Sequence, residues 1–208
     1  MNIAGYTKSE ILYDSGRSKI YRTYNKETGS SQILKTPGSE LSIDKAKVIF
    51  KSEYKIGSRL DSNLHLKYIE YNESQGKPYI LTEDFGAISL KKIIPEKGLE
   101  ISTFFKYAIQ IVDAVAQLHH KQIIHKDICP GNIVVNPKTG LLKLIDFGSA
   151  SNFIKEIGDN KSVLTHATLA FISPEQTGRI NRLVTYKTDF YSIGITFFNM
   201  LTGRYPFT

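Results

Sequence analysis

The chain has 208 residues, and its composition, 41% hydrophobic and 23% charged, is typical of a folded globular protein. Its formal charge is +7, but the Lys and Arg residues are scattered, so we expect no nucleic-acid surface. The N-terminus lacks the apolar segment of a signal peptide, and the longest apolar stretch, 190–201, is shorter than the roughly 20 residues of a membrane span. Cys129 is the only cysteine, so no intrachain disulfide can form and we expect a cytoplasmic protein with no membrane span.

The first part of the chain is predicted to be rich in strands. Residues 10–24 and 30–35 have the composition of strands, and the polar segment 25–29 between them is suited to a turn. A helix is predicted over 42–60, with Ser42 as its N-cap. Its expected apolar positions are Val48, Ile49, Ile56 and Leu60. Residues 78–86 then predict a short apolar strand that ends in a turn.

From residue 101 the hydrophobic period becomes that of a helix, over 101–120. The expected apolar stripe of this helix is Phe104, Tyr107, Ala108, Ile111, Val112, Val115 and Leu118. A hairpin follows over 132–148, and an almost wholly apolar helix is predicted over 188–201. A strand-rich part therefore precedes a helix-rich part, with a boundary near 84–88.

The segment "IIHKDICPGNIVV" at 123–135 carries the strongest chemical signal. Asp127 is followed after four residues by Asn132, and a predicted hairpin leads on to Asp146 in an Asp-Phe-Gly triplet. Phosphoryl transfer from ATP needs a carboxylate beside the attacking hydroxyl and oxygen ligands that hold magnesium on the phosphates. Asp127 is suited to the first role, and Asn132 and Asp146 to the second.

These residues resemble the protein kinase superfamily, specifically the eukaryote-like (Hanks-type) Ser/Thr kinases of bacteria. "HKDICPGN" is similar to the catalytic loop, "IDFG" to the magnesium loop, and "SPEQ" at 173–176 to the end of the activation segment. The run from "SPEQTGRINR" into "YKTDFYSIG" is similar to kinase domains that begin large multidomain bacterial signalling proteins. The resemblance implies a bilobal α+β fold. It has an antiparallel-sheet N-lobe over 1–86, a hinge near 83–87 and a mainly helical, incomplete C-lobe over 87–208.

The resemblance also implies ATP and Mg²⁺ as cofactors and a protein substrate with a Ser or Thr acceptor. Asp127 would be the catalytic base, Lys35 would hold the phosphates, and Glu53 would form an ion pair with Lys35. Thr168 would hydrogen-bond near the base, and His125 would pack beneath Phe147. Asn132 and Asp146 would bind the metal. The residues implied at the adenine are Ile20, Ile33, Thr82, Glu83, Phe85 and Val134.

Several positions depart from the family pattern around the nucleotide. Tyr13, Ser15 and Ser18 stand where three glycines are usual, with Gly16 displaced by one, so ATP affinity is in doubt. Ile33 replaces a small alanine and should narrow the adenine slot. Gly57 replaces a bulky residue of the regulatory stack, so we expect the 42–60 helix to be loosely held.

Other departures lie in the catalytic loop and at the end of the chain. Cys129 replaces a lysine that meets the γ-phosphate, and Lys126 replaces an arginine. Because the chain stops soon after the 188–201 helix, we expect further helices or domains beyond Thr208. Without them, Glu175 would lack its arginine partner and part of that helix would be uncovered.

A second Asp-Phe-Gly triplet occurs at 84–86, where the resemblance places the hinge. We expect Asp84 to point to solvent and to matter little for activity. Two other functions remain open. One is a pseudokinase or degenerate kinase fragment that binds partners, which Cys129 and Gly57 favour. The other is a small-molecule kinase, against which "SPEQ" and the Thr168 segment count.

Overall fold

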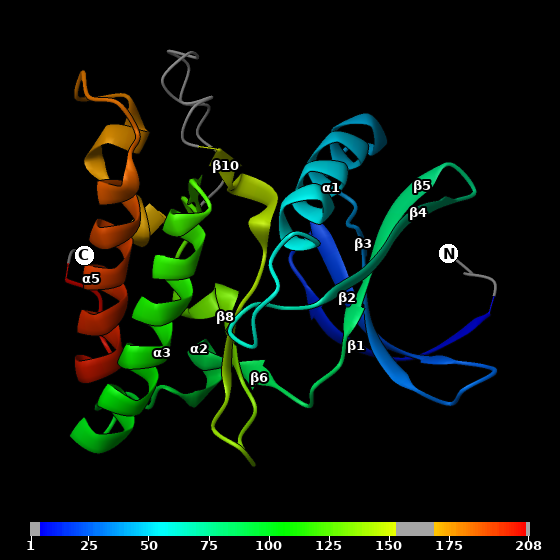
Figure 1. The fold of residues 1–208 in the computed structure, drawn as a ribbon, viewed down its shortest axis with the longest axis horizontal. Coiled ribbons are helices and arrows are strands. Elements are labelled where there is room, and N and C mark those ends of the chain that lie inside the picture. The colour runs from blue at the N-terminus through cyan, green and yellow to red at the C-terminus, as the bar shows by residue number, and fades with distance from the viewer. Residues whose placement is uncertain (1–4, 153–168, 207–208) are drawn as a thin grey trace. The chain divides into compact units, whose positions relative to one another are not determined.

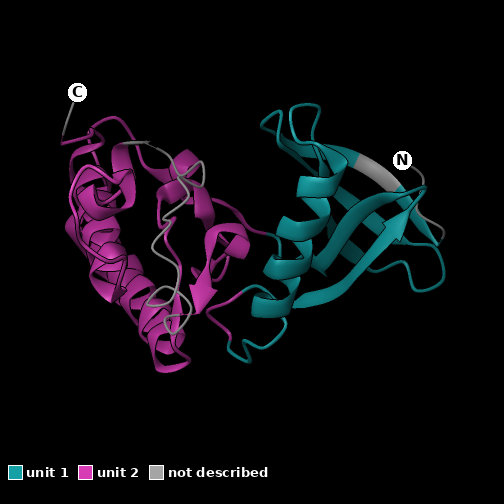
Figure 2. Ribbon diagram, turned by 90° about the horizontal axis from the view of Figure 1, so that it is seen from above, with its two compact units in different colours: residues 1–62, 66–86 teal, residues 63–65, 87–208 magenta. Residues whose placement is uncertain are grey.

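The computed structural model describes residues 5–152 and 169–206. These residues form two compact units, coloured separately in Figure 2. The first unit comprises residues 1–62 and 66–86, and the second comprises residues 63–65 and 87–208.

The first unit is built on an antiparallel sheet with the strand order β1-β2-β3-β5-β4 (Figure 1). Its strands are β1 (Tyr6–Asp14), β2 (Ser18–Asn25), β3 (Ser31–Pro37), β4 (Tyr68–Ser74) and β5 (Lys77–Glu83). The strand expected over 10–24 is in fact a hairpin of β1 and β2, because Gly16 takes a φ of +74° and turns the chain. The turn expected over 25–29 does join β2 to β3.

One face of this sheet carries an apolar cluster. Leu34, Tyr79 and Leu81 are buried there, and Tyr6 and Tyr21 pack against them. Because side chains alternate along a strand, Lys35 lies on the opposite face of the sheet from Leu34.

Helix α1 (Ile43–Gly57) packs against β4 and β5. Its buried residues are Ala46, Phe50, Glu53 and Gly57. The predicted face was therefore wrong at Val48, which is 71% exposed. The buried stripe contains an acid and a glycine, so hydrophobicity does not reveal it. Ser42 occupies the N-cap position as predicted, but its side chain makes no capping hydrogen bond.

The second unit is mainly helical. In its described residues the α-helices are α2 (Leu90–Ile93), α3 (Ile101–His120) and α5 (Tyr186–Thr202). Its short strands are β6 (Ile88–Ser89), β7 (Ile123–Ile124), β8 (Ile133–Val135), β9 (Leu142–Leu144) and β10 (Ser151–Asn152). Single 3₁₀ turns occur at Pro130–Asn132, Phe147–Ser149, Leu169–Phe171 and Pro174–Thr177. The fold class is therefore α+β, as expected, and β8 and β9 form the predicted antiparallel hairpin.

The core of the second unit lies where α3 packs on α5 (Figure 1). The rings of Phe104 and Phe197 meet edge to face there, with centroids 5.4 Å apart. The predicted stripe of α3 is buried except for Val112, which is 47% exposed, whereas Ala114 is fully buried. Along the described ranges 5–152 and 169–206, no helix combines the length and apolar character needed to cross a membrane.

Candidate active site

The first group of candidate site residues centres on Lys35 in β3. Its Nζ atom lies 2.8 Å from Oε2 of Glu53 in α1, and the two side chains are only 13% and 3% exposed. The other carboxylate oxygen of Glu53, Oε1, accepts a hydrogen bond of 3.0 Å from the hydroxyl of Tyr68. The ion pair implied by the resemblance is thus present, with a tyrosine that the sequence did not indicate.

The strand register gathers four of the candidate nucleotide residues on one face of the sheet. Ile20 lies opposite Lys35 across β2 and β3, and Thr82 lies opposite Ile33 across β3 and β5. Residues that face each other across antiparallel strands share a side of the sheet, and so do Ile33 and Lys35, two positions apart in one strand. This face combines the apolar side chains of Ile20 and Ile33 with the cation of Lys35, and Arg22, opposite Ile33, lies on the same side of the sheet.

The loop between β1 and β2 occupies the position of the glycine-rich loop of the family. Gly16 supplies a positive φ there, and its carbonyl accepts a hydrogen bond of 2.7 Å from the backbone N–H of Glu40. Gly38 donates a second bond of 2.7 Å to the carbonyl of Arg17. The loop is therefore held by the segment after β3, although it has fewer glycines than usual.

The candidate hinge residues are held by backbone and side-chain hydrogen bonds within the first unit. Lys67 donates its N–H to Oε1 of Glu83 at 2.7 Å, and the N–H of Glu83 donates to the carbonyl of Lys67 at 3.0 Å. The carbonyl of Glu83 accepts a 3.5 Å hydrogen bond from the hydroxyl of Thr82. Phe85 lies half-buried in the following loop.

The expectation that Asp84 points to solvent was wrong. Its side chain is 8% exposed and accepts hydrogen bonds from Nε of Arg22 at 2.7 Å, from the hydroxyl of Ser31 at 2.6 Å and from the N–H of Gly86 at 3.0 Å. Burial raises the pKa of Asp84, but the hydrogen bonds from Ser31 and Arg22 outweigh it and hold the pKa below its ordinary value. Asp84 thus ties the hinge segment to β2 and β3.

The second group of candidate site residues lies in the loop after β7. Nδ2 of Asn132 donates to both the carbonyl oxygen and Oδ2 of Asp127, each at 2.9 Å. This double contact orients the carboxylate of Asp127 and leaves the amide oxygen of Asn132 outside these bonds. The N–H of Ile145 donates to the carbonyl of Asn132 at 3.0 Å, which brings the residue before Asp146 next to Asn132.

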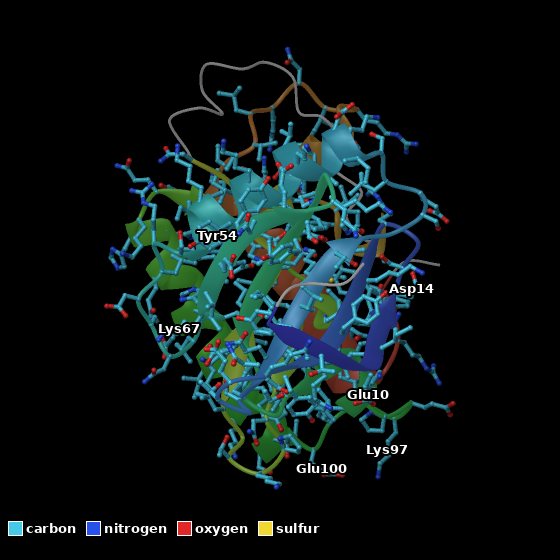
Figure 3. All side chains as sticks on the ribbon, turned by 90° about the vertical axis from the view of Figure 1, so that its right-hand side faces the viewer. Glu10, Asp14, Tyr54, Lys67, Lys97 and Glu100 are labelled. Atoms are coloured by element: carbon cyan, nitrogen blue, oxygen red, sulfur yellow. The ribbon has the colours of Figure 1, made fainter. Side chains whose placement is uncertain are left out.

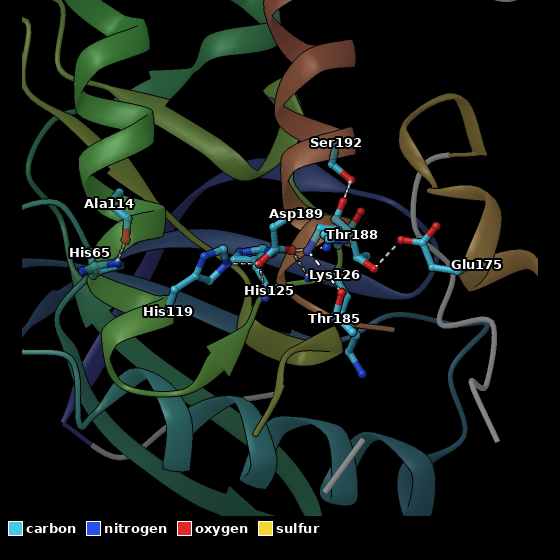
Figure 4. A network of polar contacts seen from close by, with 12 residues as sticks. His65, Ala114, His119, His125, Lys126, Glu175, Thr185, Thr188, Asp189 and Ser192 are labelled. Carbon is cyan, nitrogen blue, oxygen red and sulfur yellow. Dashed lines mark hydrogen bonds and ion pairs between the residues drawn. The ribbon is translucent and has the colours of Figure 1, made fainter. Parts of the chain in front are cut away.

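Helix α5 holds this loop through Asp189, which is fully buried (Figure 4). Its carboxylate accepts the backbone N–H groups of His125 and Lys126 at 2.9 and 2.8 Å, and lies 2.8 Å from Nε2 of His119. Lys126 has a φ of +68°, a conformation that costs a non-glycine residue energy. Gln176 binds the carbonyl of Lys126 at 2.8 Å, so the strained residue is held on both sides.

Asp146 follows β9 with a φ of +64°, and its Oδ1 accepts the N–H of Gly148 at 3.2 Å. The buried Phe147 ring lies 5.3 Å from the ring of His125, so the packing role expected for His125 is confirmed. His65 also contacts Phe147, with centroids 6.1 Å apart. The sequence did not single out His65, because its contacts are distant in the chain.

Burial lowers the pKa of His65 to about 4. Its Nε2 lies 3.0 Å from the carbonyl of Ala114, to which the neutral ring donates. Within the described ranges, the other nitrogen, Nδ1, is buried without a hydrogen-bond partner. The structure therefore favours the neutral form of His65.

The structure shows what surrounds Gly57, Glu175 and Cys129, the three residues for which the sequence suggested a missing contact. A Cβ atom at Gly57 would collide with the ring of Tyr68, so an aromatic side chain already fills the space above the glycine. Glu175 does have a partner, because the hydroxyl of Thr188 donates to it at 2.7 Å. Cys129 is buried in an apolar cluster with Phe171 and Ile195.

Val134 and Thr168 are the remaining candidate site residues. Val134 is half-buried in β8, between the fully buried Ile133 and Val135. Thr168 lies outside the described residues. The oxygen donors of Asn132 and Asp146 are of the kind that Mg²⁺ prefers, so the donor set fits that metal.

Comparison with known proteins agrees with this geometry. The family model described as "Protein kinase domain" matches residues 6–208. The chain belongs to the protein kinase family. It is 27% identical to the human Serine/threonine-protein kinase STK11 over 218 residues, covering 99% of this chain and 48% of that protein. It is 35% identical to the Serine/threonine-protein kinase PrkC of Bacillus subtilis over 160 residues, covering 76% of this chain and 24% of that protein. This kinase domain thus spans about half the length, or less, of these curated relatives.

Proposed function

We propose that this kinase domain transfers the γ-phosphate of Mg-ATP to Ser or Thr hydroxyls of proteins. The observation that carries the proposal is the double contact of Asn132 with Asp127. It fixes the Asp127 carboxylate, which in this mechanism accepts the proton of the attacking hydroxyl.

The other residues have supporting roles in this proposal. Lys35, oriented by Glu53, binds the phosphates, and Ile20 and Ile33 contact the adenine ring. Asn132 and Asp146 would hold Mg²⁺, which neutralises charge on the phosphates when bound. The ion pair at Lys35 supports this role, because the Glu53 carboxylate offsets the desolvation of a cation that is only 13% exposed and holds it in place.

The choice of a Ser or Thr acceptor is supported by the relatives STK11 and PrkC, both of which are serine/threonine-protein kinases. Membership of the protein kinase family favours a protein acceptor over a small molecule. We further propose that the domain acts in the cytoplasm, where ATP is available. Other domains of a longer protein would select the substrate.

The test is phosphate transfer from labelled ATP to a generic protein substrate in the presence of magnesium. Asp127→Asn should lower the rate by about 100-fold or more, because the base is lost while the side-chain shape is kept. Removing magnesium with a chelator should abolish transfer. Transfer that survives Asp127→Asn unchanged would contradict the mechanism.

A second function is favoured by one observation, the burial of Cys129 in an apolar cluster. The usual lysine is absent at this position, and the residue present offers no cation to a phosphate. A pseudokinase would bind Mg-ATP or a partner protein without transfer. Binding of Mg-ATP by calorimetry, with no label transfer by the wild-type chain, would favour this alternative.

A further inference from the structure

The contact between Gly57 and Tyr68 joins the end of α1 to the start of β4. A Cβ atom at Gly57 would collide with ring atoms Cε2, Cδ2 and Cζ of Tyr68. The ring therefore occupies the volume that a side chain at position 57 would take. Tyr68 is 7% exposed, so this packing is part of the core of the first unit.

The hydroxyl of Tyr68 extends this contact to the ion pair. It donates to Oε1 of Glu53 at 3.0 Å, while Oε2 of the same carboxylate lies 2.8 Å from Nζ of Lys35. Glu53 is only 2% exposed, so rotation of its carboxylate would break a buried hydrogen bond or ion pair. Tyr68 thus acts on Lys35 through Glu53.

Neighbouring aromatic rings fix the direction of the Tyr68 side chain. The ring of Tyr54, a residue labelled in Figure 3, meets that of Tyr68 at 71° with centroids 6.4 Å apart. The Tyr54 ring also lies next to the ring of Tyr71, with centroids 6.2 Å apart. The rings of α1 and β4 therefore pack together on the same side of the sheet as the ion pair.

We propose that Tyr68 is a positioning residue that holds Glu53 in contact with Lys35, and that Gly57 is required because it leaves room for the Tyr68 ring. This inference rests on the proposed function for its catalytic consequence, since the positioned Lys35 is the phosphate ligand there. It replaces the expectation that the glycine loosens α1. The missing side chain is supplied by the opposing strand, together with a hydroxyl that an aliphatic residue would lack.

The first test measures the positioning without nucleotide. The full chain is treated with an amine-acylating reagent, and the modification rate of Lys35 is followed by peptide mass spectrometry. In Tyr68→Phe the ring still fills the space at Gly57, but the hydrogen bond to Glu53 is lost. We expect Lys35 to be acylated several-fold faster than in the wild type, because a looser Glu53 protects the amine less.

Tyr71→Phe is the matched control, because Tyr71 belongs to the same group of rings and has the same chemistry. Its Lys35 should react at the wild-type rate. An unchanged rate in Tyr68→Phe, or an equal rise in both variants, would overturn the proposal. Thermal unfolding of both variants shows whether a faster reaction comes merely from general loss of structure.

The requirement for glycine is tested by Gly57→Ala. Alanine ordinarily favours a helix over glycine, so a purely local effect would stabilise α1. We expect the opposite here, with faster acylation of Lys35, because the methyl group displaces the Tyr68 ring. In the Tyr68→Phe background, Gly57→Ala should add little to the acylation rate, since the hydroxyl contact is already lost. Wild-type protection of Lys35 in Gly57→Ala would overturn this part of the proposal.

The catalytic consequence is measured separately. Tyr68→Phe should raise the KM for ATP and lower kcat/KM, and Tyr71→Phe should change neither. If the wild-type chain transfers no phosphate, the proposed function fails while the acylation result still decides the role of Tyr68. If transfer occurs and Tyr68→Phe leaves it unchanged, Tyr68 is not a positioning residue for the reaction.

Discussion

At the scale of single residues, the two Asp-Phe-Gly triplets have the same sequence but different surroundings in the structure. Asp84 forms three hydrogen bonds within the first unit and is almost buried. Asp146 takes a left-handed backbone conformation shortly after β9. The residue before it, Ile145, donates a backbone hydrogen bond to Asn132. Strained non-glycine residues are commonly found at functional sites, whereas a hydrogen-bonded ion pair is commonly structural.

We predict opposite effects for substitutions at the two aspartates. Asp84→Ala should lower the free energy of unfolding by about 2 kcal/mol, because Arg22 and Ser31 lose a charged acceptor. It should raise the KM for ATP while leaving magnesium-dependent transfer in place. Asp146→Asn should abolish transfer with little loss of stability, because asparagine tolerates the left-handed conformation.

Urea denaturation and kinase assays on the two purified variants check this prediction. Equal loss of phosphate transfer in both variants would contradict the assignment of a structural role to Asp84 and a catalytic role to Asp146. An Asp84→Ala chain with wild-type stability would show that the contact between Asp84 and Arg22 contributes little to the free energy of unfolding.

At the scale of elements, α5 acts as the support of the catalytic loop. Its first turn contributes Asp189, whose carboxylate accepts two backbone N–H groups of the loop. A hydroxyl at Ser192 further binds the carbonyl of Phe171 at 2.8 Å, so the same helix also holds the segment before "SPEQ". The helix that was expected to be almost wholly apolar in fact buries mostly polar residues, which are Thr188, Asp189, Ser192, Thr196 and Asn199. Asp189 and Ser192 each hold a neighbouring loop through the hydrogen bonds given above.

We predict that Asp189→Ala destabilises the second unit by about 3 kcal/mol, because two buried backbone donors lose their acceptor. The amide protons of His125 and Lys126 should then exchange faster with solvent, as hydrogen-exchange mass spectrometry can detect. Asp113→Ala, which removes an exposed aspartate of α3, is the control and should change neither quantity. Unchanged exchange in Asp189→Ala would contradict the supporting role of α5.

At the scale of the whole molecule, the segment 63–65 matters because it belongs to the second unit although its neighbours in sequence belong to the first. Leu64 accepts a backbone hydrogen bond of 2.9 Å from Leu144, and His65 binds the carbonyl of Ala114 in α3. These bonds attach a connecting segment to α3 and β9. His65 adds a buried base to the core beneath Phe147.

We predict that the stability of the second unit falls as the pH drops from about 6.5 to about 4. The folded pKa of His65 is lowered to about 4, so the unfolded chain takes up the proton first and is favoured in this range. The contribution of neutral His65 to the free energy of unfolding is fully present above pH 6.5 and amounts to about 3 kcal/mol. Urea denaturation as a function of pH should show this slope, and His65→Leu should flatten it. A slope that persists in His65→Leu would assign it to other groups.

The sequence was sufficient to predict features that depend on local spacing. The hairpin of β8 and β9, the helix over α3 and the order of Asp127, Asn132 and Asp146 all follow from patterns within a few tens of residues. The resemblance to protein kinases drew on the same short motifs and is confirmed by the family match. The roles assigned to individual site residues stay predictions.

Other features were decided only by tertiary packing. The buried face of α1 includes Glu53 and Gly57, which no hydrophobic pattern marks, and Tyr68 reaches them from a strand that lies beyond a loop. Likewise, Asp84 accepts a hydrogen bond from Arg22, which lies 62 residues earlier in the chain. The physical reason is the same in both cases. Local sequence sets which conformations a segment prefers, but the partner of a buried polar side chain depends on which distant strand or helix the fold brings next to it.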